Sequence, residues 1–348
     1  MAGLVPGIAV ARSRIEYVNG AHMKILITGA AGFIGSHVSA ELLRQGYDVV
    51  GIDSMNDYYS LELKRDRLRE LLASKRFHFL EVDISDFGQI ESVSNKIRAD
   101  KILHLAAQAG VRYSIDHPHA YSSANLVGHF HLLELARKWE VDNFVYASSS
   151  SVYGGNTKVP FCETDQTDDP VSFYGATKKS NELMSHSYSS LYGLSASGLR
   201  FFTVYGPKGR PDMAYWIFAD KIKRGAPIKV FNQGNMKRDF TYIDDIVSGT
   251  IAALEKPARE FATGAPHRIY NLGNDQPEYL LDLISEIESA LNLEAKKQFM
   301  PIQKGDVPNT WAEISRARSE LGFQPSTTLH EGIEKFMHWF SARGDRYK

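Results

Sequence analysis

The chain has 348 residues, enough for one large domain or two moderate ones, and its 43% hydrophobic and 23% charged residues are typical of a globular enzyme. A formal net charge of -1 argues against a nucleic-acid-binding surface, because such a surface needs an excess of basic residues. Cys162 is the only cysteine, which excludes an intrachain disulfide and a cysteine-based metal cluster and fits a reducing cytoplasm. No apolar run approaches the roughly 20 residues that a membrane-spanning helix requires.

Residues 1–22 precede a second methionine, Met23, and Arg12 and Arg14 interrupt their apolar stretches. They therefore lack the apolar core of a signal peptide. We interpret them as a natural extension or a cloning remnant and exclude them from the predicted fold.

From Met23 onward, short β-branched segments alternate with longer segments of helical pattern. Nearly continuous apolar strands joined by helices indicate a parallel sheet that is buried on both faces. The predicted fold class is therefore α/β, with a doubly wound (Rossmann) parallel sheet. The predicted strands are 24–28, 48–53, 77–82, 101–107 and 143–149.

After about Phe201 this alternation weakens, and prolines separate shorter elements. We expect a smaller C-terminal α/β domain that covers the substrate, while a helix near 243–253 and a strand at 268–273 return to the main sheet. The predicted division is a dinucleotide-binding domain at 23–200, joined by 243–273, and a substrate domain at 201–242 and 274–348.

A glycine motif, "ILITGAAGFIGSHV", follows the first predicted strand with Gly29, Gly32 and Gly35 in the spacing G-x-x-G-x-x-G. Glycines permit a tight turn and let the backbone approach a pyrophosphate at a helix N-terminus. Alone, the motif is equally typical of a simple strand-to-helix turn. Asp53 ends the second strand, where an acid accepts hydrogen bonds from the ribose hydroxyls, and Ser54 supplies no cation for a 2′-phosphate. The motif therefore predicts an NAD site.

Asp83 and Ile84 follow the third predicted strand, where Asp83 is expected to hydrogen-bond the adenine. The alternative role for this acid is a helix N-cap, for which Ser85 and Asp86 are equally suited. The predicted cofactor site is completed by Phe33, Ile34, Leu105, Ala106 and Ala107.

Tyr174 and Lys178 form a Y-x-x-x-K pattern in "FYGATKKSNELM". Residues four apart lie on one face of a helix. The phenol ionises near pH ~10, and an ammonium beside it, together with a positive nicotinamide ring, lowers that pKa. The pair is therefore suited to take a proton from an alcohol while hydride leaves the carbon. A chance pattern on an amphipathic helix is the alternative.

Five segments together resemble the extended short-chain dehydrogenase/reductase family, in its nucleotide-sugar branch: "TGAAGFIG", "HLAAQAGVR", "ASSSSVYG", "YGATK" and "LRFFTVYGP". The resemblance runs from about Met23 to the C-terminus. Within the family, "DSMNDYYSLELKRDRL", "FFTVYGPKGRPDMA" and "PIQKGDVPNTWA" are similar to the UDP-glucuronate 4-epimerases. The predicted substrate and its contacts are implied by this resemblance.

The serines of "ASSSSVYG" distinguish reactions within the family. The resemblance implies that Ser149 hydrogen-bonds the 4-hydroxyl of the sugar and works with Tyr174. Dehydratases carry an Asp-Glu pair after this position and decarboxylases a Glu directly before the valine, whereas this chain has Ser150 and Ser151. Ser150 is also predicted to contact the substrate.

The implied reaction is C4 epimerisation of UDP-glucuronate to UDP-galacturonate through a transient 4-keto sugar. Tyr174 acts as the base, and hydride passes to bound NAD and back. The alternatives are a UDP-glucose or UDP-N-acetylglucosamine 4-epimerase and a UDP-glucuronate decarboxylase. From another class, an NAD-sensing scaffold usually lacks the Tyr or the Lys, and both are present here.

The resemblance also assigns substrate contacts, and for the arginines a surface ion pair is the alternative. Phe201 and Phe202 are expected to shield the nicotinamide ring, while Thr203 and Arg210 hold the sugar carboxylate. For the UDP part, Arg238 is expected to pair with the diphosphate and Asp306 to accept from the ribose. Phe231 stacks on uracil unless it is a core residue, and Arg112 is a further cation whose role stays open. Gln303 stands where UDP-glucose epimerases usually have an arginine, which favours the uronate branch.

The 12 histidines show no metal-binding spacing, so no metal site is predicted, and His104 is expected to be a satisfied strand-end residue. The apolar sides of Asn125–Trp139 and Tyr174–Tyr192 are implied to pair between two subunits as a four-helix homodimer interface; burial within one chain is the alternative. The resemblance implies a cytoplasmic enzyme of polysaccharide biosynthesis, with no nucleic-acid or membrane partner.

Overall fold

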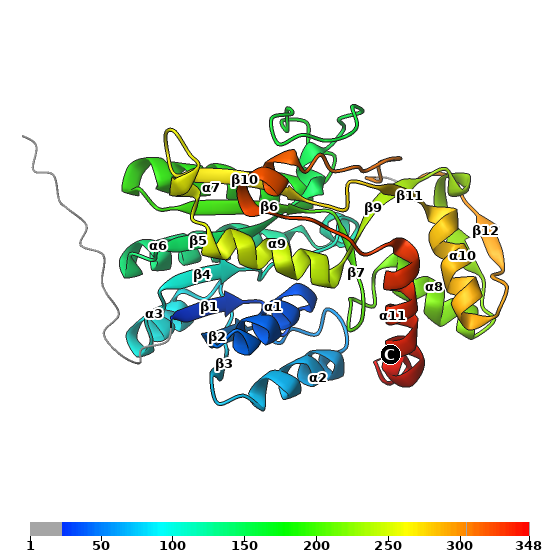
Figure 1. Cartoon of the computed structure of the whole chain (residues 1–348), viewed down its shortest axis with the longest axis horizontal. Coiled ribbons are helices and arrows are strands. Elements are labelled where there is room, and N and C mark those ends of the chain that lie inside the picture. Colours follow the sequence, from blue (N-terminus) through cyan, green and yellow to red (C-terminus); the bar gives the residue numbers. More distant parts are fainter. Residues whose placement is uncertain (1–22, 304, 348) are drawn as a thin grey trace, which may run out of the picture.

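The computed structural model describes residues 23–303 and 305–347, and the predicted extension at 1–22 lies outside them. Figure 1 shows a layered α/β lobe that contains most of the N-terminal half and, beside it, a smaller lobe formed by later segments. Among the described residues, no helix is both long and apolar enough to cross a membrane.

A seven-stranded parallel sheet forms the centre of the larger lobe, in the order β10-β6-β5-β4-β1-β2-β3. Its strands are β1 Lys24–Thr28, β2 Asp48–Asp53, β3 Phe77–Glu81, β4 Lys101–His104, β5 Asn143–Ser149, β6 Ala196–Phe201 and β10 His267–Leu272. The predicted fold class is confirmed. β4 ends three residues before the predicted boundary, because the chain leaves the sheet at Leu105 to line a pocket.

Helices cover both faces of this sheet (Figure 1). On one face α1 packs against α2 and α9, and on the other α6 packs against α3 and α7. Their bounds are α1 Phe33–Arg44, α2 Leu61–Leu72, α3 Phe87–Lys96, α6 Gly128–Trp139, α7 Phe173–Tyr192 and α9 Ile243–Glu255. The helix predicted from Asn125 begins at Gly128, because short helical turns precede it: α4 Tyr113–Asp116, α5 Pro118–Tyr121 and a π-helical turn, Ser122–Val127.

The smaller lobe contains a three-stranded sheet, β11-β9-β7, and a two-stranded one, β12-β8. Its elements are β7 Thr203–Tyr205, α8 Ala214–Lys223, β8 Ile228–Val230, β9 Lys237–Tyr242, β11 Pro277–Tyr279, α10 Leu280–Leu291, β12 Lys297–Phe299 and α11 Leu329–Arg343. One hydrophobic core continues from β1 and β2 into this lobe, where Tyr215 packs edge-on against Phe336 with ring centroids 4.9 Å apart. The shared core holds the two lobes together.

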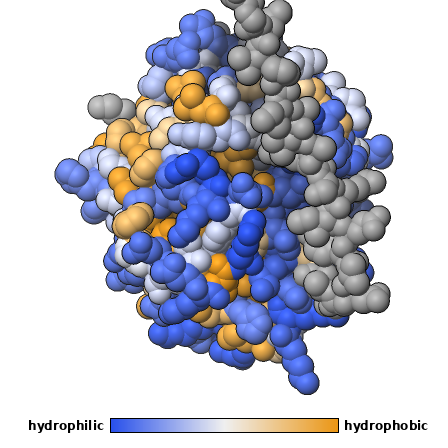
Figure 2. Space-filling view, turned by 90° about the vertical axis from the view of Figure 1, so that its left-hand side faces the viewer, coloured by the Kyte–Doolittle hydropathy of each residue, from blue (hydrophilic) through white to orange (hydrophobic). Residues whose placement is uncertain are grey.

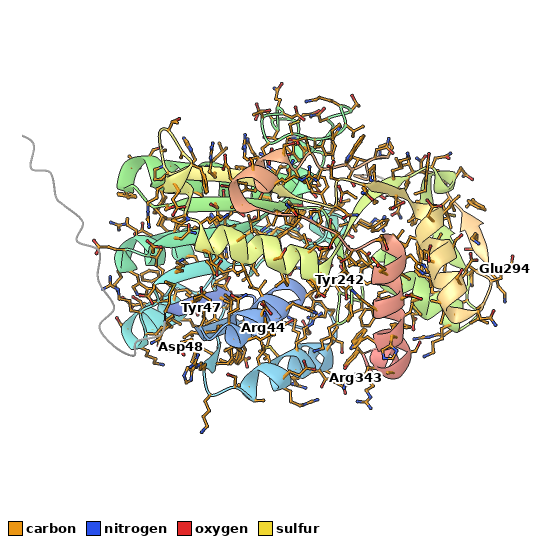
Figure 3. The ribbon with its side chains drawn as sticks, in the orientation of Figure 1. Arg44, Tyr47, Asp48, Tyr242, Glu294 and Arg343 are labelled. Atoms are coloured by element: carbon orange, nitrogen blue, oxygen red, sulfur yellow. The ribbon has the colours of Figure 1, made fainter. Side chains whose placement is uncertain are left out.

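One polar contact lies within the smaller lobe and another joins the two lobes (Figure 3). Tyr242, where β9 leads into α9, lies beside α11, and Lys335 of that helix places its Nζ 4.9 Å from the centre of the tyrosine ring. Arg343, at the end of α11, lies 3.8 Å from Glu70 of α2. Both residues of this second pair are about half exposed, so its contribution to stability is small.

Arg67 of α2 connects the glycine turn after β1 with the loop after β7. Its side chain is 1% exposed and donates to Ala31 O at 2.9 Å, to Gly209 O at 2.8 Å and to Lys208 O at 2.6 Å. Tyr59 OH completes its partners at 2.7 Å. A buried cation with four hydrogen-bonded partners fixes the distance between these two loops.

Replacing Arg67 by methionine tests this connection. We expect the free energy of unfolding to fall by about 3 kcal/mol or more, because three buried carbonyl oxygens lose a charged donor. Arg65→Met on the same helix is the matched control, since Arg65 is exposed; it should change stability by less than about 0.5 kcal/mol. Urea titrations measure both, and equal effects would contradict the proposed role of Arg67.

Candidate active site

A cavity of about 270 Å³ opens at the carboxyl ends of the central strands and is closed on one side by the loop after β7. This edge of a doubly wound sheet is where ligands bind, because the loops diverge there. All the predicted cofactor-binding residues line the cavity: Gly29, Gly32, Phe33, Ile34, Gly35, Asp53, Asp83, Ile84, Leu105, Ala106, Ala107, Tyr174, Lys178 and Phe201. Ser149, Phe202 and Arg210 line it as well.

The glycine turn is packed too closely for side chains. Gly29 has a φ of +71°, and a Cβ there would lie 2.8 Å from Ala106 N. A Cβ on Gly35 would lie 2.1 Å from Gly29 O. Gly32 is the N-cap of α1 and provides no side chain to cap the helix, so the first N–H groups of α1 stay available to an anion.

Asp53 is held in place at the end of β2. Its carboxylate accepts from Ala31 N at 3.2 Å and from Met55 N at 3.0 Å. Lys64 Nζ lies 3.9 Å from Asp53 Oδ1 and donates to Asn56 O at 2.8 Å. The prediction that no cation lies near Asp53 was wrong, because α2 folds back and carries Lys64 to the pocket.

The two acids after β3 have separate roles. Asp86 caps α3, since its side chain accepts from Gln89 N at 3.0 Å. Asp83 lines the cavity, and its carboxylate accepts from Ser85 N at 2.9 Å. The N-cap alternative therefore applies to Asp86, and Asp83 is available to a ligand.

The predicted catalytic residues meet where α7 crosses the end of β5. Ser172 caps α7 by accepting from Gly175 N at 3.0 Å, which fixes the first turn that carries Tyr174. One turn later, Lys178 Nζ donates to Ala147 O at 3.0 Å. Ser149 Oγ accepts from Ser151 N at 3.1 Å, and the Ser149 hydroxyl lowers the pKa of the Tyr174 phenol.

Burial controls the ionisation of this group. It lowers the pKa of Lys178 to about 8, since no water compensates the ammonium. It also raises the pKa of Tyr174, and the Ser149 hydroxyl and the Arg210 cation oppose this rise. From the sequence, Lys178 and a positive nicotinamide ring together are expected to lower the phenol pKa; in the protein without a cofactor, burial has the larger effect and the pKa of Tyr174 is raised.

The remaining residues of this edge occupy three environments. Ser148 donates from its hydroxyl to Glu182 Oε1 at 2.6 Å and is one of the residues that line the cavity. Ser150 lies in a 3₁₀ turn, Ser150–Tyr153, and Thr203 lies in β7 between two residues that line the cavity. Neither Ser150 nor Thr203 is itself among the lining residues.

Arg210 is paired on the cavity wall by residues that sequence reasoning missed. Its Nε donates to Asp212 Oδ1 at 3.0 Å and its Nη2 to Asp212 Oδ2 at 2.5 Å. Tyr58 OH donates to the same carboxylate at 3.1 Å. Burial alone would raise the pKa of Asp212, but Arg210 holds it below its ordinary value. The guanidinium plane is thereby fixed beside the cavity.

Four predicted UDP contacts converge on a second cluster outside the lining of the cavity. Arg112 Nη2 pairs with Asp306 Oδ2 at 2.8 Å, and its guanidinium carbon lies 5.2 Å from the centre of the Phe231 ring. Burial lowers the pKa of Arg238, the Asp306 charge raises it and the Arg112 charge lowers it. The ion-pair alternative for Arg112 is therefore observed, with Asp306 as its partner.

The described part of the chain holds no group of three or more His, Cys, Asp or Glu residues that could bind a metal ion. His104 is buried at the end of β4, and its Nδ1 lies 2.7 Å from Thr28 Oγ1. It is a hydrogen-bonded strand-end residue, as the sequence predicts.

Residues 26–336 match the sequence model of the family described as GDP-mannose 4,6 dehydratase. The chain belongs to this family of extended short-chain dehydrogenases/reductases. The predicted family is thus confirmed, with the chain in its nucleotide-sugar epimerase branch.

Named relatives lie in the epimerase branch of the family. UDP-glucuronate 4-epimerase 2 of Arabidopsis thaliana is 46% identical, over 94% of this chain and 77% of that protein. The structure of UDP-glucuronic acid 4-epimerase from Bacillus cereus in complex with UDP-glucuronic acid and NAD is 36% identical, covers 92% of this chain and 99% of that one, and has a TM-score of 0.84. A UDP-glucose 4-epimerase structure from Thermotoga maritima, with UDP-glucose, has the same coverage, 31% identity and a TM-score of 0.83.

The glycine turn provides a direct test of the cofactor site. We expect Gly35→Ala to weaken binding of NAD by about 30-fold or more, equivalent to about 2 kcal/mol, because its Cβ forces the turn apart. Gly264→Ala is the control, since a Cβ there meets nothing within 4 Å. Isothermal titration calorimetry measures both affinities, and an unchanged affinity in Gly35→Ala would show that the turn does not hold the dinucleotide.

Proposed function

We propose that the protein is an NAD-dependent UDP-glucuronate 4-epimerase that converts UDP-glucuronate to UDP-galacturonate. The observation that carries the proposal is that one cavity is lined by Ser149, Tyr174 and Lys178 together with the glycine turn and Arg210. The named relatives, which include UDP-glucuronate 4-epimerases, support the same activity.

The residues of the cavity fit NAD. The uncapped N-terminus of α1 and the glycine turn suit the pyrophosphate, and Asp53 has free carboxylate lone pairs for the ribose hydroxyls. Lys64, with its Nζ 3.9 Å from Asp53 Oδ1, helps to hold this carboxylate in place. When bound, the nicotinamide accepts hydride from C4 of the sugar and returns it to the other face, so that no cosubstrate is consumed.

Tyr174 moves the proton. We assign its phenol as the base that takes the proton of the 4-hydroxyl and gives it back after the sugar has rotated. Ser149 lowers the pKa of the phenol and is placed to bond the same sugar hydroxyl. Lys178 supplies a positive charge that favours the phenolate. Since burial raises the pKa of Tyr174, the phenolate forms mainly when the positive nicotinamide is also present.

Arg210 and Thr203 restrain the C6 carboxylate of the substrate. This carboxylate is β to the transient C4 ketone, and it is lost as CO₂ when the C5–C6 bond aligns with the carbonyl π system. The guanidinium plane, fixed by Asp212, binds the carboxylate in one orientation and keeps that bond out of alignment. Serines at 150 and 151 provide no acid for a dehydration or decarboxylation step.

The smaller lobe binds the UDP part in this proposal. Arg238 suits the diphosphate, Phe231 suits stacking on uracil and Asp306 accepts from the ribose, while Arg112 pairs with Asp306. The lobe is thus the UDP-sugar-binding domain, 201–242 and 274–348, and Ser150 contacts the sugar from the end of β5. We place the reaction in the cytoplasm, where it supplies an activated galacturonate for polysaccharide biosynthesis.

Product analysis tests the proposed function. We expect UDP-glucuronate to give UDP-galacturonate by ¹H NMR, without added NAD and without UDP-xylose. Tyr174→Phe should lower kcat by about 10²- to 10⁴-fold, the range typical of a lost acid–base group, while NAD stays bound. UDP-xylose as the main product, or conversion of UDP-glucose alone, would overturn the proposed substrate. Wild-type activity in Tyr174→Phe would overturn the mechanism.

We also propose that two subunits pair through α6 and α7. The two helices are joined within the chain by Tyr188 OH, which donates to Glu134 Oε1 at 2.6 Å. The large hydrophobic side chains that they leave exposed are Val127 at the entry to α6, Phe130, Phe173, Leu183, Leu191 and Tyr192. Figure 2 shows that the side of the molecule from which it is drawn carries hydrophobic patches among hydrophilic residues. Burial of apolar patches from two α6–α7 pairs stabilises a four-helix interface.

Size-exclusion chromatography with light scattering tests this pairing. The wild type is expected to be a dimer at micromolar concentration, and Leu183→Glu to shift it toward monomer, because a carboxylate is not tolerated in an apolar interface. Leu293→Glu, at an exposed leucine of the smaller lobe, is the control and should leave the dimer intact. A monomeric wild type, or a dimer that tolerates Leu183→Glu, would refute the interface.

A further inference from the structure

A buried ion pair lies directly behind the proposed catalytic residues. Arg200 of β6 donates from Nε and from Nη2 to the two carboxylate oxygens of Glu182, both at 2.8 Å. The two side chains are only 3% and 5% exposed. Ser148 Oγ donates to Glu182 Oε1 at 2.6 Å. The carboxylate on α7 is therefore held between the ends of β5 and β6.

Glu182 is also the nearest acid along the helix to Lys178. The two residues are four positions apart on α7, so that their side chains lie on the same face, and both are buried. They contact consecutive residues of β5, since Lys178 Nζ bonds Ala147 O and Glu182 bonds Ser148. At this spacing the Glu182 carboxylate would be attracted to the Lys178 ammonium if it had no other partner. In the structure, Lys178 Nζ instead donates its hydrogen bond to the backbone carbonyl oxygen of Ala147.

The reason lies in how completely Arg200 occupies the carboxylate. Its fork covers both oxygens of Glu182, the arrangement in which an arginine–carboxylate pair is strongest. The guanidinium is fixed from its other side, with its carbon 4.8 Å from the centre of the Tyr153 ring. Its Nη1 donates to Glu163 O at 3.4 Å. Both carboxylate oxygens of Glu182 therefore already have a partner on β6.

We propose that Arg200 is a positioning residue that keeps the Glu182 carboxylate from pairing with Lys178 and so leaves the Lys178 ammonium free to act on Tyr174. The inference rests on the roles that the proposed function gives to Lys178 and Tyr174. If Glu182 turned to Lys178, the adjacent negative charge would cancel the field of the ammonium at the phenol. The phenolate would then form less readily, and turnover at neutral pH would fall.

Other titratable groups surround this trio from every packed element. They are His104 on β4, His129 on α6, Tyr146 on β5, His186 on α7 and His267 on β10, with Tyr121 and Arg210 facing Tyr174. Burial lowers the pKa of His104 to about 3 and that of His267 to about 4, and that of His129 falls well below its usual value. These three histidines are neutral at pH 7. The charges that decide the outcome are those of Lys178, Glu182 and Arg200.

The test compares Arg200→Met with Glu182→Gln by NMR of lysines labelled with ¹³C at Cε, with the Lys178 signal assigned from Lys178→Met. In Arg200→Met we expect the pKa of Lys178 to rise by about 1 or more, because Glu182 becomes its partner. The acid limb of the kcat/KM profile should move to higher pH, with little change in KM. In Glu182→Gln the Lys178 pKa and the acid limb should stay as in the wild type, although the protein is less stable.

Controls separate positioning from simple loss of stability. Arg268→Met removes another partly buried arginine, which pairs with Glu320 at 2.7 Å, and should leave the Lys178 pKa unchanged. The double variant Arg200→Met/Glu182→Leu replaces the ion pair by apolar groups and should restore both the stability and the wild-type pKa of Lys178. If Arg200→Met does not fold, Arg200→Leu takes its place, because it too removes every donor from residue 200 to Glu182.

An unchanged Lys178 pKa in folded Arg200→Met or Arg200→Leu would overturn the proposal, since Glu182 would then not have become the partner of Lys178. A raised Lys178 pKa in Glu182→Gln would overturn it as well. The NMR titration needs no substrate. A wild type that does not convert UDP-glucuronate would therefore defeat the proposed function while the titration still decides on Arg200.

Discussion

The contact of α7 with the end of β5 is the constraint on which the site depends. Lys178 donates to a carbonyl of β5 at 3.0 Å, and this bond fixes the rotation of α7, because its ammonium is buried and has to find an oxygen. With that rotation fixed, Tyr174 meets the hydroxyl of Ser149, which the next turn of chain holds through Ser151 N. The same strand edge faces the glycine turn across one cavity.

The charges in this interior are arranged so that each has its own partner. Glu182 forms an ion pair with Arg200, and Asp212 forms one with Arg210. Arg67 instead donates hydrogen bonds to backbone carbonyl oxygens of two loops. Such partners are important for stability, because a buried charge without a partner is not solvated by water. Because these acids already have cationic partners, the Lys178 ammonium is available, in the proposed mechanism, to stabilise the Tyr174 phenolate.

The fold class could be predicted from the sequence because it depends on local patterns, and the residues predicted to bind the cofactor do line one cavity. Buried parallel strands have a recognisable apolar run, and the glycine turn and Asp53 have fixed spacings. Lys64 and Asp212 were not predicted, since a lone lysine on α2 and an aspartate in a loop carry no pattern; the fold alone brings them to Asp53 and Arg210. Two serines illustrate this difference. The motif "ASSSSVYG" singles out Ser149, whereas the hydrogen bond from Ser148 to Glu182 depends on how α7 packs and has no sequence pattern.

The most direct test of the proposed mechanism follows the hydrogen at C4. UDP-glucuronate labelled with deuterium at C4 is converted in ordinary water, and the product is analysed by NMR and mass spectrometry. If Tyr174 moves only the hydroxyl proton and the C4 hydrogen leaves and returns as hydride inside the closed cavity, UDP-galacturonate retains the deuterium at C4. Loss of the deuterium to solvent would contradict the mechanism, because it would mean that C4 is deprotonated and not oxidised.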